Sequence, residues 1–433
     1  MSETAGAAAK LEIVLGAHVM DWWGGSVTYT MTVARELARL GHRVTTFSPR
    51  VGEPGRVARG WGLEIVDDET ALPDRCSVVF AQDAWSAYTL GSRYAEAPIV
   101  ACMHGDEADM FFPPQADGLV SATVALYDRV AARARALAGN VPVVRLSQPV
   151  DLRRFAPHGP LANPARRALA FGNYLNGDRR AHLAAACRDV GLDVRFVGAN
   201  TSHKTVDAPE YELNKADIVI GKARVIVEAL ACGRAAYVYD HNGGDGWVTP
   251  DTYDVHAADN FAGQSTGEVI DAARLRRDLA AYRPDMGPAN RDLAVLHHNV
   301  TAHAHALVEL FRGLAPRTAP APDALGELAR LTALEWDSSV RLNAAAYWGA
   351  QAMAESRRFE EERDAAVTDA HAVREHRDEI QSEIGRVREE NRELAAERDA
   401  LRAERDTLLR TRRYRLAQAL ARPLDVLRRR GSE

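Results

Sequence analysis

Hydrophobic and polar positions alternate in two patterns along the first 313 residues. Short apolar runs bounded by turn-forming residues predict strands buried on both faces of a parallel sheet. Stretches with apolar residues three or four positions apart follow most of these runs and predict helices. The predicted strands form a first set at 11–15, 44–47, 63–66, 77–80, 99–102, 118–123 and 143–146 and a second at 168–171, 194–197, 218–220 and 236–239.

A proline-containing segment at 151–166 separates the two sets of predicted strands and is typical of a linker. Strands that alternate with helices in this way predict an α/β fold with two doubly wound, Rossmann-like domains. We expect an N-terminal domain at 1–155 and a second domain at 156–314. A predicted helix at about 291–312 would end the second domain and cross back to the first. It carries four histidines, but we expect no metal site there, because no triad of carboxylates is evident beside them.

Prolines 316, 320 and 322 mark the end of the globular pattern, and no further proline occurs until Pro423. The residues between are rich in Glu, Arg and Ala and predict a linker and helix at 315–345 and a coiled coil at 346–411. With Ile384 at heptad position a, later a positions hold Asn391, Arg398 and Arg405, which favours two strands. The alternative is a single solvated helix. The d positions are all apolar: Phe359, Ala366, Val373, Ile380, Val387, Leu394, Leu401 and Leu408.

The last segment, 412–433, is a basic amphipathic tail. Residues 410–430 contain eight arginines and one acidic residue, with apolar residues interleaved. This pattern is typical of segments that lie on anionic membrane surfaces. The alternative is a solvated basic helix end that its own dipole stabilises.

Composition narrows the class of protein. The 433 residues carry a net charge of −6, so no basic excess points to nucleic acid. The four cysteines match no zinc or redox spacing and are typical of buried thiols in a reducing cytosol. We find no signal-peptide pattern and no run of 18 apolar residues. We therefore expect a cytoplasmic protein, with the tail as a peripheral contact at the inner membrane face.

Two segments carry candidate chemistry in the first predicted domain. Gly24 and Gly25 lie between the first strand and its helix, where the backbone can approach a ligand and the helix N-terminus favours an anion. His104 follows the strand at 99–102 and should face the crevice at the carboxyl edge of the sheet. It could donate a hydrogen bond to a sugar hydroxyl or carry a proton. The alternatives are a tight turn and an ordinary loop histidine.

Over residues 11–313 the chain resembles the GT-B glycosyltransferases, and in particular the retaining glycosyltransferase family 4. The glycine pair and the segment around His104 are similar to that family. In the segment RLSQPVDLRRFAP, the residues Val150, Asp151, Phe155 and Pro157 match its interdomain motif. The most specific pieces are this motif and the segment EALACG.

The resemblance implies a substrate crevice between the domains, a nucleotide-sugar donor held mainly by the second domain, and neither metal nor cofactor. It implies that His104 contacts the transferred sugar and that Glu228 accepts hydrogen bonds from the ribose hydroxyls of the donor. Gly243 and Gly244 would bring backbone amides near the sugar or phosphate.

The chain also departs from the family pattern. Ile220 stands where the family has a glutamate that contacts the donor sugar. Asn173 stands near the usual arginine of the diphosphate site, and Arg179 or Arg180 near the usual lysine. Because a leaving diphosphate needs cationic neutralisation, we expect Lys222 and Arg224 to take over part of its binding. The alternative for both is a solvent-exposed loop.

The favoured function is transfer of a sugar, with retention, from a nucleotide sugar to a saccharide or lipid-linked acceptor in cell-surface polysaccharide or glycoconjugate synthesis. Homodimerisation through the coiled coil is expected. One alternative is a catalytically inactive scaffold that acts through its coiled coil, since Ile220 and Asn173 replace expected donor contacts. Another is a nucleotide-sugar epimerase, which would need further acid–base carboxylates in the crevice.

Overall fold

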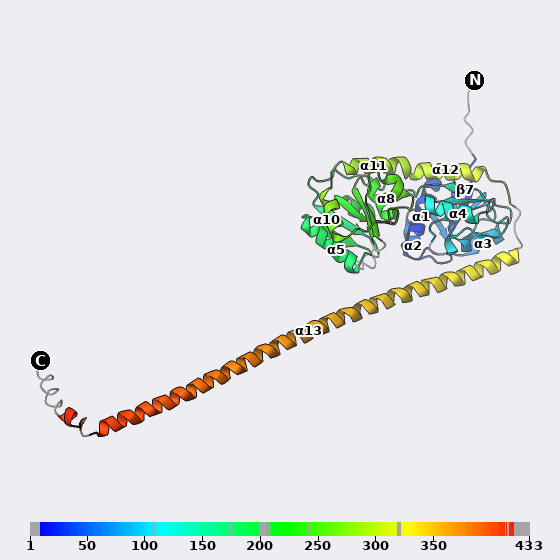
Figure 1. Cartoon of the computed structure of the whole chain (residues 1–433). Coiled ribbons are helices and arrows are strands. Elements are labelled where there is room, and N and C mark those ends of the chain that lie inside the picture. The colour runs from blue at the N-terminus through cyan, green and yellow to red at the C-terminus, as the bar shows by residue number, and fades with distance from the viewer. Residues whose placement is uncertain are drawn as a thin grey trace. The chain divides into compact units, whose positions relative to one another are not determined.

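The computed structural model describes residues 9–106, 109–173, 175–198, 206, 208–240, 243–317, 322–411, 413 and 415–419. The chain divides into two compact units, Met1–Ser339 and Val340–Glu433. The first unit contains two sheets, each with its own helices (Figure 1). The predicted α/β fold with two Rossmann-like sheets is therefore confirmed, and a long helix follows them.

The first sheet has seven strands in the order β3-β2-β1-β4-β5-β6-β7, and every pair is parallel. Buried apolar residues fill nearly every position of its inner strands, as the continuous apolar runs predicted. Its strands are β1 (Glu12–Gly16), β2 (Arg43–Phe47), β3 (Glu64–Val66), β4 (Val78–Ala81), β5 (Ile99–Met103), β6 (Ala122–Ala125) and β7 (Val143–Arg145). Its helices are α1 (Gly25–Arg39), α2 (Glu53–Gly60), α3 (Ala84–Arg93) and α4 (Asp128–Leu137), with the 3-10 turns η1 (Glu69–Ala71) and η2 (Asp109–Phe111).

The strand predicted at 118–123 lies further along the chain, at β6. Gly118 has φ +71°, a left-handed conformation outside the β region, so the chain turns there before the strand begins.

The second sheet has five strands in the order β12-β11-β10-β8-β9, and only β12 is antiparallel to its neighbour. Its strands are β8 (Arg167–Phe171), β9 (Asp193–Val197), β10 (Ile218–Gly221), β11 (Ala235–Asp240) and β12 (Gly243–Trp247). Its helices are α5 (Gly177–Asp189), α7 (Pro209–Asn214), α8 (Arg224–Ala231), α9 (Tyr253–Ala257), α10 (Ala272–Ala280) and α11 (Met286–His297).

Strand β12 contains Gly243 and Gly244, where the hydrophobic pattern predicted no strand. Its sequence GGDGW lacks the branched and aromatic residues that normally indicate a strand. The glycines are needed by packing instead, because a Cβ on Gly244 would lie 2.5 Å from the carbonyl oxygen of Val238 on β11.

The predicted final helix is two helices, α11 and α12 (Val300–Arg312), which meet at His298 and Asn299. The Asn299 side chain accepts a hydrogen bond from the backbone N–H of Thr301 and so caps α12. Figure 1 shows α11 and α12 running end to end across both halves of the first unit. Leu307 and Phe311 of α12 lie in the same hydrophobic core as β1 and α1.

Two buried histidines join the helices α11 and α12 to the linker between the sheets, which comprises the residues between β7 and β8. The His298 ring bonds the Gln148 carbonyl oxygen through Nδ1 at 2.7 Å and the Tyr253 hydroxyl through Nε2 at 2.9 Å. The His303 ring bonds the Ser147 carbonyl oxygen and the Tyr29 hydroxyl in the same way. A carbonyl can only accept, so each Nδ1 carries the proton and each Nε2 accepts from a tyrosine.

Glu36 ties the same crossing to α1. Its carboxylate accepts hydrogen bonds from Arg39, from Arg153 of the linker and from the Thr301 hydroxyl of α12. Burial alone would raise the pKa of Glu36, but these hydrogen bonds outweigh it and lower the pKa to about 2. The carboxylate therefore stays charged at neutral pH and holds three segments together.

The last helix, α13 (Pro322–Arg410), begins on the first unit. Leu325 and Ala329 are buried in a core cluster of the first sheet. Trp336 is 5% exposed, lies edge-on to the ring of His18 and packs against Phe111. The segment predicted as a linker and helix at 315–345 therefore contributes to the globular core as far as its second half.

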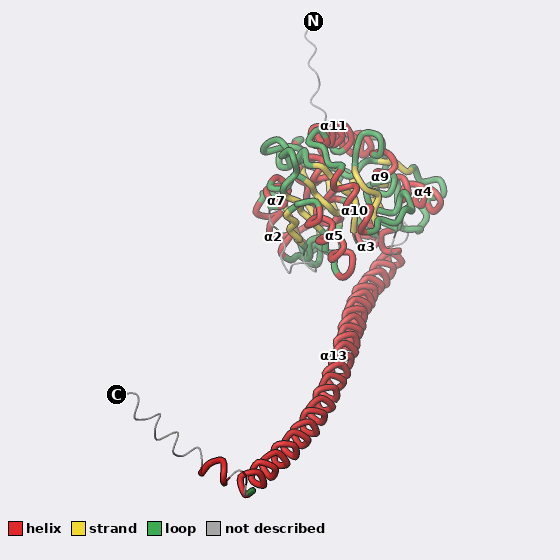
Figure 2. The backbone as a smooth tube through the Cα atoms, turned by 60° about the vertical axis from the view of Figure 1, so that its left-hand side comes forward, coloured by secondary structure: helices red, strands yellow, loops and turns green. Residues whose placement is uncertain are grey.

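From Val340 onward α13 forms the second unit, and Figure 2 shows it as one unbroken helix. Among the described residues, none of the helices has both the length and the apolar character that crossing a bilayer requires. Most of the predicted tail at 412–433 lies outside the described residues.

We predict that His298 and His303 make the free energy of unfolding depend on pH. Burial lowers the pKa of His298 and of His303 to about 4, whereas an exposed histidine titrates near 6.5. As pH falls below about 6.5 the unfolded chain takes up protons first, so stability is lost between pH 6.5 and 4 and the loss then levels off. Each histidine should account for up to ~3 kcal/mol of that loss.

The measurement is denaturant unfolding at several pH values, followed by tryptophan fluorescence. The variant His298→Gln/His303→Gln should be less stable at pH 7.5 but should lose less stability than the wild type on going to pH 5. A variant whose pH slope equals that of the wild type would contradict the assignment.

Candidate functional site

A pocket of about 290 Å³ lies within the first unit where the two sheets face each other. Most of its lining follows the carboxyl ends of strands, which is where ligands bind in doubly wound folds, and the rest comes from the segment 259–264 after α9. The register places Gly221 of β10 level with Phe171 and Val238, so the loops after these strands leave the same edge. The lining is Gly25, Ser26, His104, Leu126, Tyr127, Arg129, Gln148, Lys222, Ala223, Arg224, Asp259, Asn260, Ala262 and Gln264.

His104 follows β5 and lines the pocket, as predicted from sequence. Its Nε2 lies 2.9 Å from Oε1 of Gln82, whose own amide N–H₂ group donates to the Phe80 carbonyl. With the Gln82 amide oriented in this way, Nε2 is the donor and Nδ1 is an acceptor. Burial lowers the pKa of His104 to about 3. The ring is therefore neutral at pH 7 and, with Nε2 engaged by Gln82, presents Nδ1 as an acceptor for a hydroxyl.

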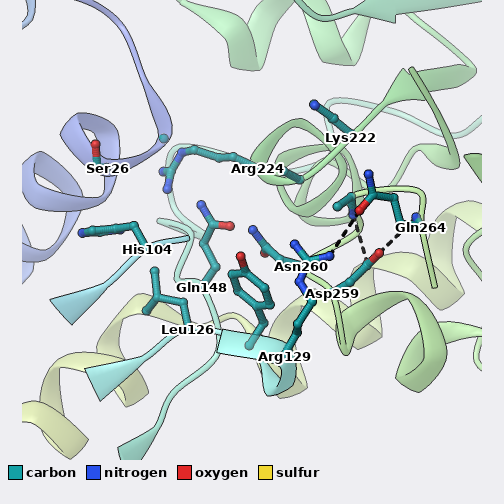
Figure 3. Close-up of a pocket in the computed structure, with 14 residues that line it drawn as sticks. Ser26, His104, Leu126, Arg129, Gln148, Lys222, Arg224, Asp259, Asn260 and Gln264 are labelled. Carbon is teal, nitrogen blue, oxygen red and sulfur yellow. Dashed lines mark hydrogen bonds between the residues drawn. The ribbon is translucent and has the colours of Figure 1, made fainter. Parts of the chain in front are cut away.

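Arg129, in the first turn of α4, bridges the two halves of the site. Its guanidinium donates to Asp106 at 3.1 Å and to Gln264 at 3.2 Å, and it lies over the Tyr127 ring. Its Nε is buried without a hydrogen-bond partner among the described residues. Figure 3 shows this side chain beside Asp259, below the loop that carries Gln264. Sequence reasoning missed this cation.

Lys222, in the loop after β10, and Arg224, the first residue of α8, both line the pocket. The Lys222 ammonium lies 3.8 Å from a carboxylate oxygen of Asp240. Arg224 is more constrained, since its Nε donates to Glu228 at 2.8 Å and its Nη2 donates to Thr32 of α1 at 3.2 Å. The arginine predicted to bind diphosphate therefore also joins the second half of the unit to the first.

Glu228 lies behind Arg224 in the middle of α8 and is 5% exposed. It does not line the pocket, and its Oε1 is occupied by Arg224. Burial raises the pKa of Glu228, and the Arg224 guanidinium opposes that rise. The structure thus gives Glu228 a part in holding Arg224 in place.

Backbone strain in the described residues is concentrated at this pocket. Ala223, Asn260 and Phe261 have φ between 51° and 60°, and they are the only non-glycine residues of the described chain with positive φ. The backbone N–H of Ala223 donates to the Phe261 carbonyl, so the two strained loops hold each other. Asp259 supports the second loop by accepting from the backbone N–H groups of Ala262 and Gln264. Strain of this kind persists where the surroundings fix a functional geometry.

Gln148 lies in the linker between the sheets and lines the pocket. It is 5% exposed, and its Oε1 has no hydrogen-bond partner among the described residues. Figure 3 shows its amide between His104 on one side and Asn260 on the other. A buried, unpaired amide oxygen costs free energy unless a ligand donates to it, so Gln148 is a candidate contact.

The glycine pair opens α1, with Gly24 as the N-cap and Gly25 as the first helical residue. No side chain caps this end of the helix, and Gly25 and Ser26 line the pocket. Their backbone N–H groups are thus among the unsatisfied donors of a helix N-terminus, which suit an anion.

The remaining predicted residues lie apart from the pocket lining. Asn173 follows β8, and Arg179 in α5 lies over the Tyr239 ring. Gly243 and Gly244 belong to β12, and a Cβ on Gly243 would meet the Gly263 carbonyl at 3.2 Å, next to the strained loop. Ile220 is completely buried in β10, so its position offers no contact to a ligand.

Taken together, the pocket lining has three cationic side chains, Arg129, Lys222 and Arg224, and one carboxylate, Asp259. Both oxygens of Asp259 accept backbone N–H groups. In the described part of the chain, no group of three or more His, Cys, Asp or Glu side chains is placed to hold a metal ion. The arrangement can neutralise an anion of two or more charges beside a neutral hydrogen-bond acceptor.

Comparison with protein-family models finds no match, and comparison with curated proteins finds none. Solved structures with a similar fold include a glycosyltransferase from Rickettsia africae. It has a TM-score of 0.49 and 13% identity over 70% of this chain and 98% of that one. Anabaena HepE in complex with UDP and glucose has a TM-score of 0.45 and 13% identity over 70% of this chain and all of that one. Sucrose-phosphate synthase from Thermosynechococcus elongatus has a TM-score of 0.42 and 13% identity over 70% of this chain and 98% of that one.

We predict that Glu228→Ala destabilises the first unit strongly. The substitution leaves the Arg224 guanidinium buried without its carboxylate, which typically costs about 3–5 kcal/mol. Denaturant unfolding would measure the loss. The matched control is Glu327→Ala, which breaks a solvent-exposed pair with Arg330 and should leave the free energy of unfolding almost unchanged. Equal losses in the two variants would contradict a buried structural pair.

Proposed function

We propose that this chain is a glycosyltransferase that moves a sugar from a nucleotide-diphosphate-sugar donor to a saccharide or lipid-linked acceptor. The observation that carries the proposal is the group of Arg129, Lys222 and Arg224 beside the uncapped N-terminus of α1. A nucleoside diphosphate that leaves a sugar gains negative charge in the transition state. Fixed cations and helix N–H groups stabilise that charge without a metal ion or a cofactor.

The other contacts suit the two ends of such a donor. His104 would accept a hydrogen bond from a hydroxyl of the transferred sugar through Nδ1, and Gln148 would accept a second through its unpaired oxygen. Asn173, Arg179, Gly243 and Gly244 lie on the second half, and we assign them to the nucleotide side of the donor. Glu228 would contact the ribose through the oxygen that Arg224 does not bind.

Retention of configuration is part of the proposal. An inverting transfer needs a general base for the acceptor hydroxyl. In the pocket lining Asp259 has both oxygens engaged by backbone N–H groups, and His104, with a pKa of about 3, is a weak base at neutral pH. The departing phosphate can instead take the proton from the acceptor on the face that it leaves. The protein then acts by positioning the reactants and stabilising charge.

The nucleotide should be identified first, by thermal shift with UDP, GDP, ADP, dTDP and CMP. One of them should stabilise the protein. Arg129→Gln should weaken its binding about 10- to 100-fold, because a charge-assisted hydrogen bond to phosphate is lost. Arg276→Gln is the control, since Arg276 is exposed on α10 and pairs with Asp189. Its affinity should equal that of the wild type.

Sugar conjugates of that nucleotide should then be tested with saccharide and lipid-linked acceptors. Release of the nucleoside diphosphate with formation of a glycoside would establish transfer. A folded protein that none of the nucleotides stabilises would favour the inactive scaffold. Conversion of the donor into its epimer without transfer would favour the epimerase.

Two further parts of the proposal concern the C-terminal region. We propose that α13 pairs with a second copy of the chain, and that the basic segment 410–430 contacts an anionic membrane. Such a contact would keep the enzyme near a lipid-linked acceptor in cell-surface polysaccharide or glycoconjugate synthesis, at the inner membrane face. Each arginine near an anionic surface contributes about 1 kcal/mol to binding.

The membrane contact predicts sedimentation with vesicles that contain phosphatidylserine but not with vesicles of phosphatidylcholine alone. A variant that ends at residue 409 should stay in the supernatant while its nucleotide affinity is unchanged. Raising the salt concentration should release the full-length chain, because screening weakens the attraction. Equal sedimentation of the two chains would refute a role for the tail.

A further inference from the structure

From Phe359 to Leu408, helix α13 carries an apolar stripe that no other described part of the chain covers. The side chains at 359–411 are all exposed except Ala395, which is partly buried. Large apolar side chains at d are 45–69% exposed, and Ile384 at a is 44% exposed. The stripe repeats every seven residues, which is the spacing of a surface that another helix covers.

Four arginines occupy a positions beside this stripe, and their charges oppose pairing with another helix. Each of these charges is neutralised by an ion pair with the next residue. At the a positions 363, 377, 398 and 405, each guanidinium binds the Asp that follows it, at 2.7–2.8 Å. Because each aspartate is at a b position, the ion pair holds the guanidinium toward the edge of the a and d surface. The aliphatic stems of the arginines remain available to cover apolar surface.

The positions on either side of the stripe carry opposite charges. The g positions are mainly acidic, whereas charged e positions within this segment after Glu360 are all arginine. In order, the g residues are Glu362, Asp369, His376, Glu383, Glu390, Glu397 and Glu404. The e residues that follow them are Val367, Arg374, Gln381, Arg388, Ala395, Arg402 and Leu409.

This asymmetry decides the direction of pairing. In a parallel, in-register pair each g residue meets the e residue five positions further along the partner, and e and g charges set orientation and partner choice. Every second heptad then joins an acid to an arginine, and no like charges meet among these seven pairs. The attractive pairs are Asp369 with Arg374, Glu383 with Arg388, and Glu397 with Arg402.

An antiparallel pair would place g opposite g and e opposite e. Acidic residues would then face acidic residues along one side, and arginines would face arginines along the other. Asn391 adds an independent preference, because a buried a-position Asn finds its hydrogen-bond partner in the Asn of a helix in the same register. We propose that α13 pairs with a second copy of this chain as a parallel, in-register coiled coil over residues 359–410.

The first experiment tests direction and register by cross-linking the full-length chain. Ala370→Cys and Asn391→Cys, made separately, each place a thiol at an a position, where the two copies come within disulfide distance. Both should give a covalent dimer of twice 47.3 kDa on mild oxidation. The control Ala403→Cys places the thiol at the outward f position and should stay uncross-linked, as should the wild type with its native cysteines.

In an antiparallel pair a residue meets its own copy only at the centre of symmetry, so at most one of the two positions could cross-link. A chain that sediments as a dimer but cross-links at only one position, or at neither, would overturn the proposal. A chain that sediments as a monomer at micromolar concentration would overturn it as well.

The second experiment tests the charges. Arg374→Glu/Arg388→Glu/Arg402→Glu turns three attractive pairs on each side into repulsive ones. It should raise the dissociation constant of the dimer on the order of 100-fold at low salt. An antiparallel dimer would already hold like charges at these positions and would not weaken.

A complementary variant, Asp369→Arg/Glu383→Arg/Glu397→Arg, should also fail to pair with itself. Mixed in equal amounts, the two variants should restore the dimer, since acid again faces arginine on both sides. Rescue by mixing separates lost pairing from a damaged helix. The transfer reaction is not needed for any of these readouts, so loss of pairing and loss of activity can be told apart. Failure of the mixture to form dimers would contradict the charge pattern as the cause.

Discussion

The crossing between the two sheets is the constraint on which the site depends. A pocket lined by both halves exists only if the linker at 147–153 and the helices α11 and α12 hold the sheets in one arrangement. His298 and His303 do this as neutral rings, each joining a linker carbonyl to a tyrosine of one half. Glu36 adds a charged clamp between α1, the linker and α12. Desolvation that would be costly elsewhere is here offset by fully used hydrogen-bonding groups.

The contacts between the two halves also place the polar side chains of the pocket. Gln148, whose carbonyl is held by His298, is placed with its amide among the pocket side chains. Arg224 reaches from α8 to Thr32 of α1, and Arg129 reaches from α4 to Gln264. The cations that would neutralise a leaving group thus also join the halves, so binding of a diphosphate and the closeness of the sheets are energetically linked.

Much of the fold could be predicted from the sequence, because buried parallel strands leave continuous apolar runs and helices leave a period of 3.6 residues. Gly25, His104, Lys222 and Arg224 could be placed near the site because each follows a predicted strand. Arg129 and Gln148 could not, since one begins an ordinary amphipathic helix and the other lies in an extended linker. The loop at 259–264 gave only a weak signal, an Asp-Asn pair followed by Gly263. The positive φ of Asn260 and Phe261 depends on contacts with a loop distant in sequence.

The two units draw their stability from different sources, and this shapes what the protein can do. The first unit buries its own cores, whereas the heptad stripe of α13 gains free energy only by pairing with another helix. Parallel pairing would put two globular units at the N-terminal end of the coil and two basic segments at the other end. Tethered segments bind a surface with the gain of multivalency, so two weak contacts with anionic lipid would hold the dimer where a single one would release it. A parallel dimer would thus bind an anionic membrane more tightly than a monomer does. This difference would require no change in the pocket of the first unit.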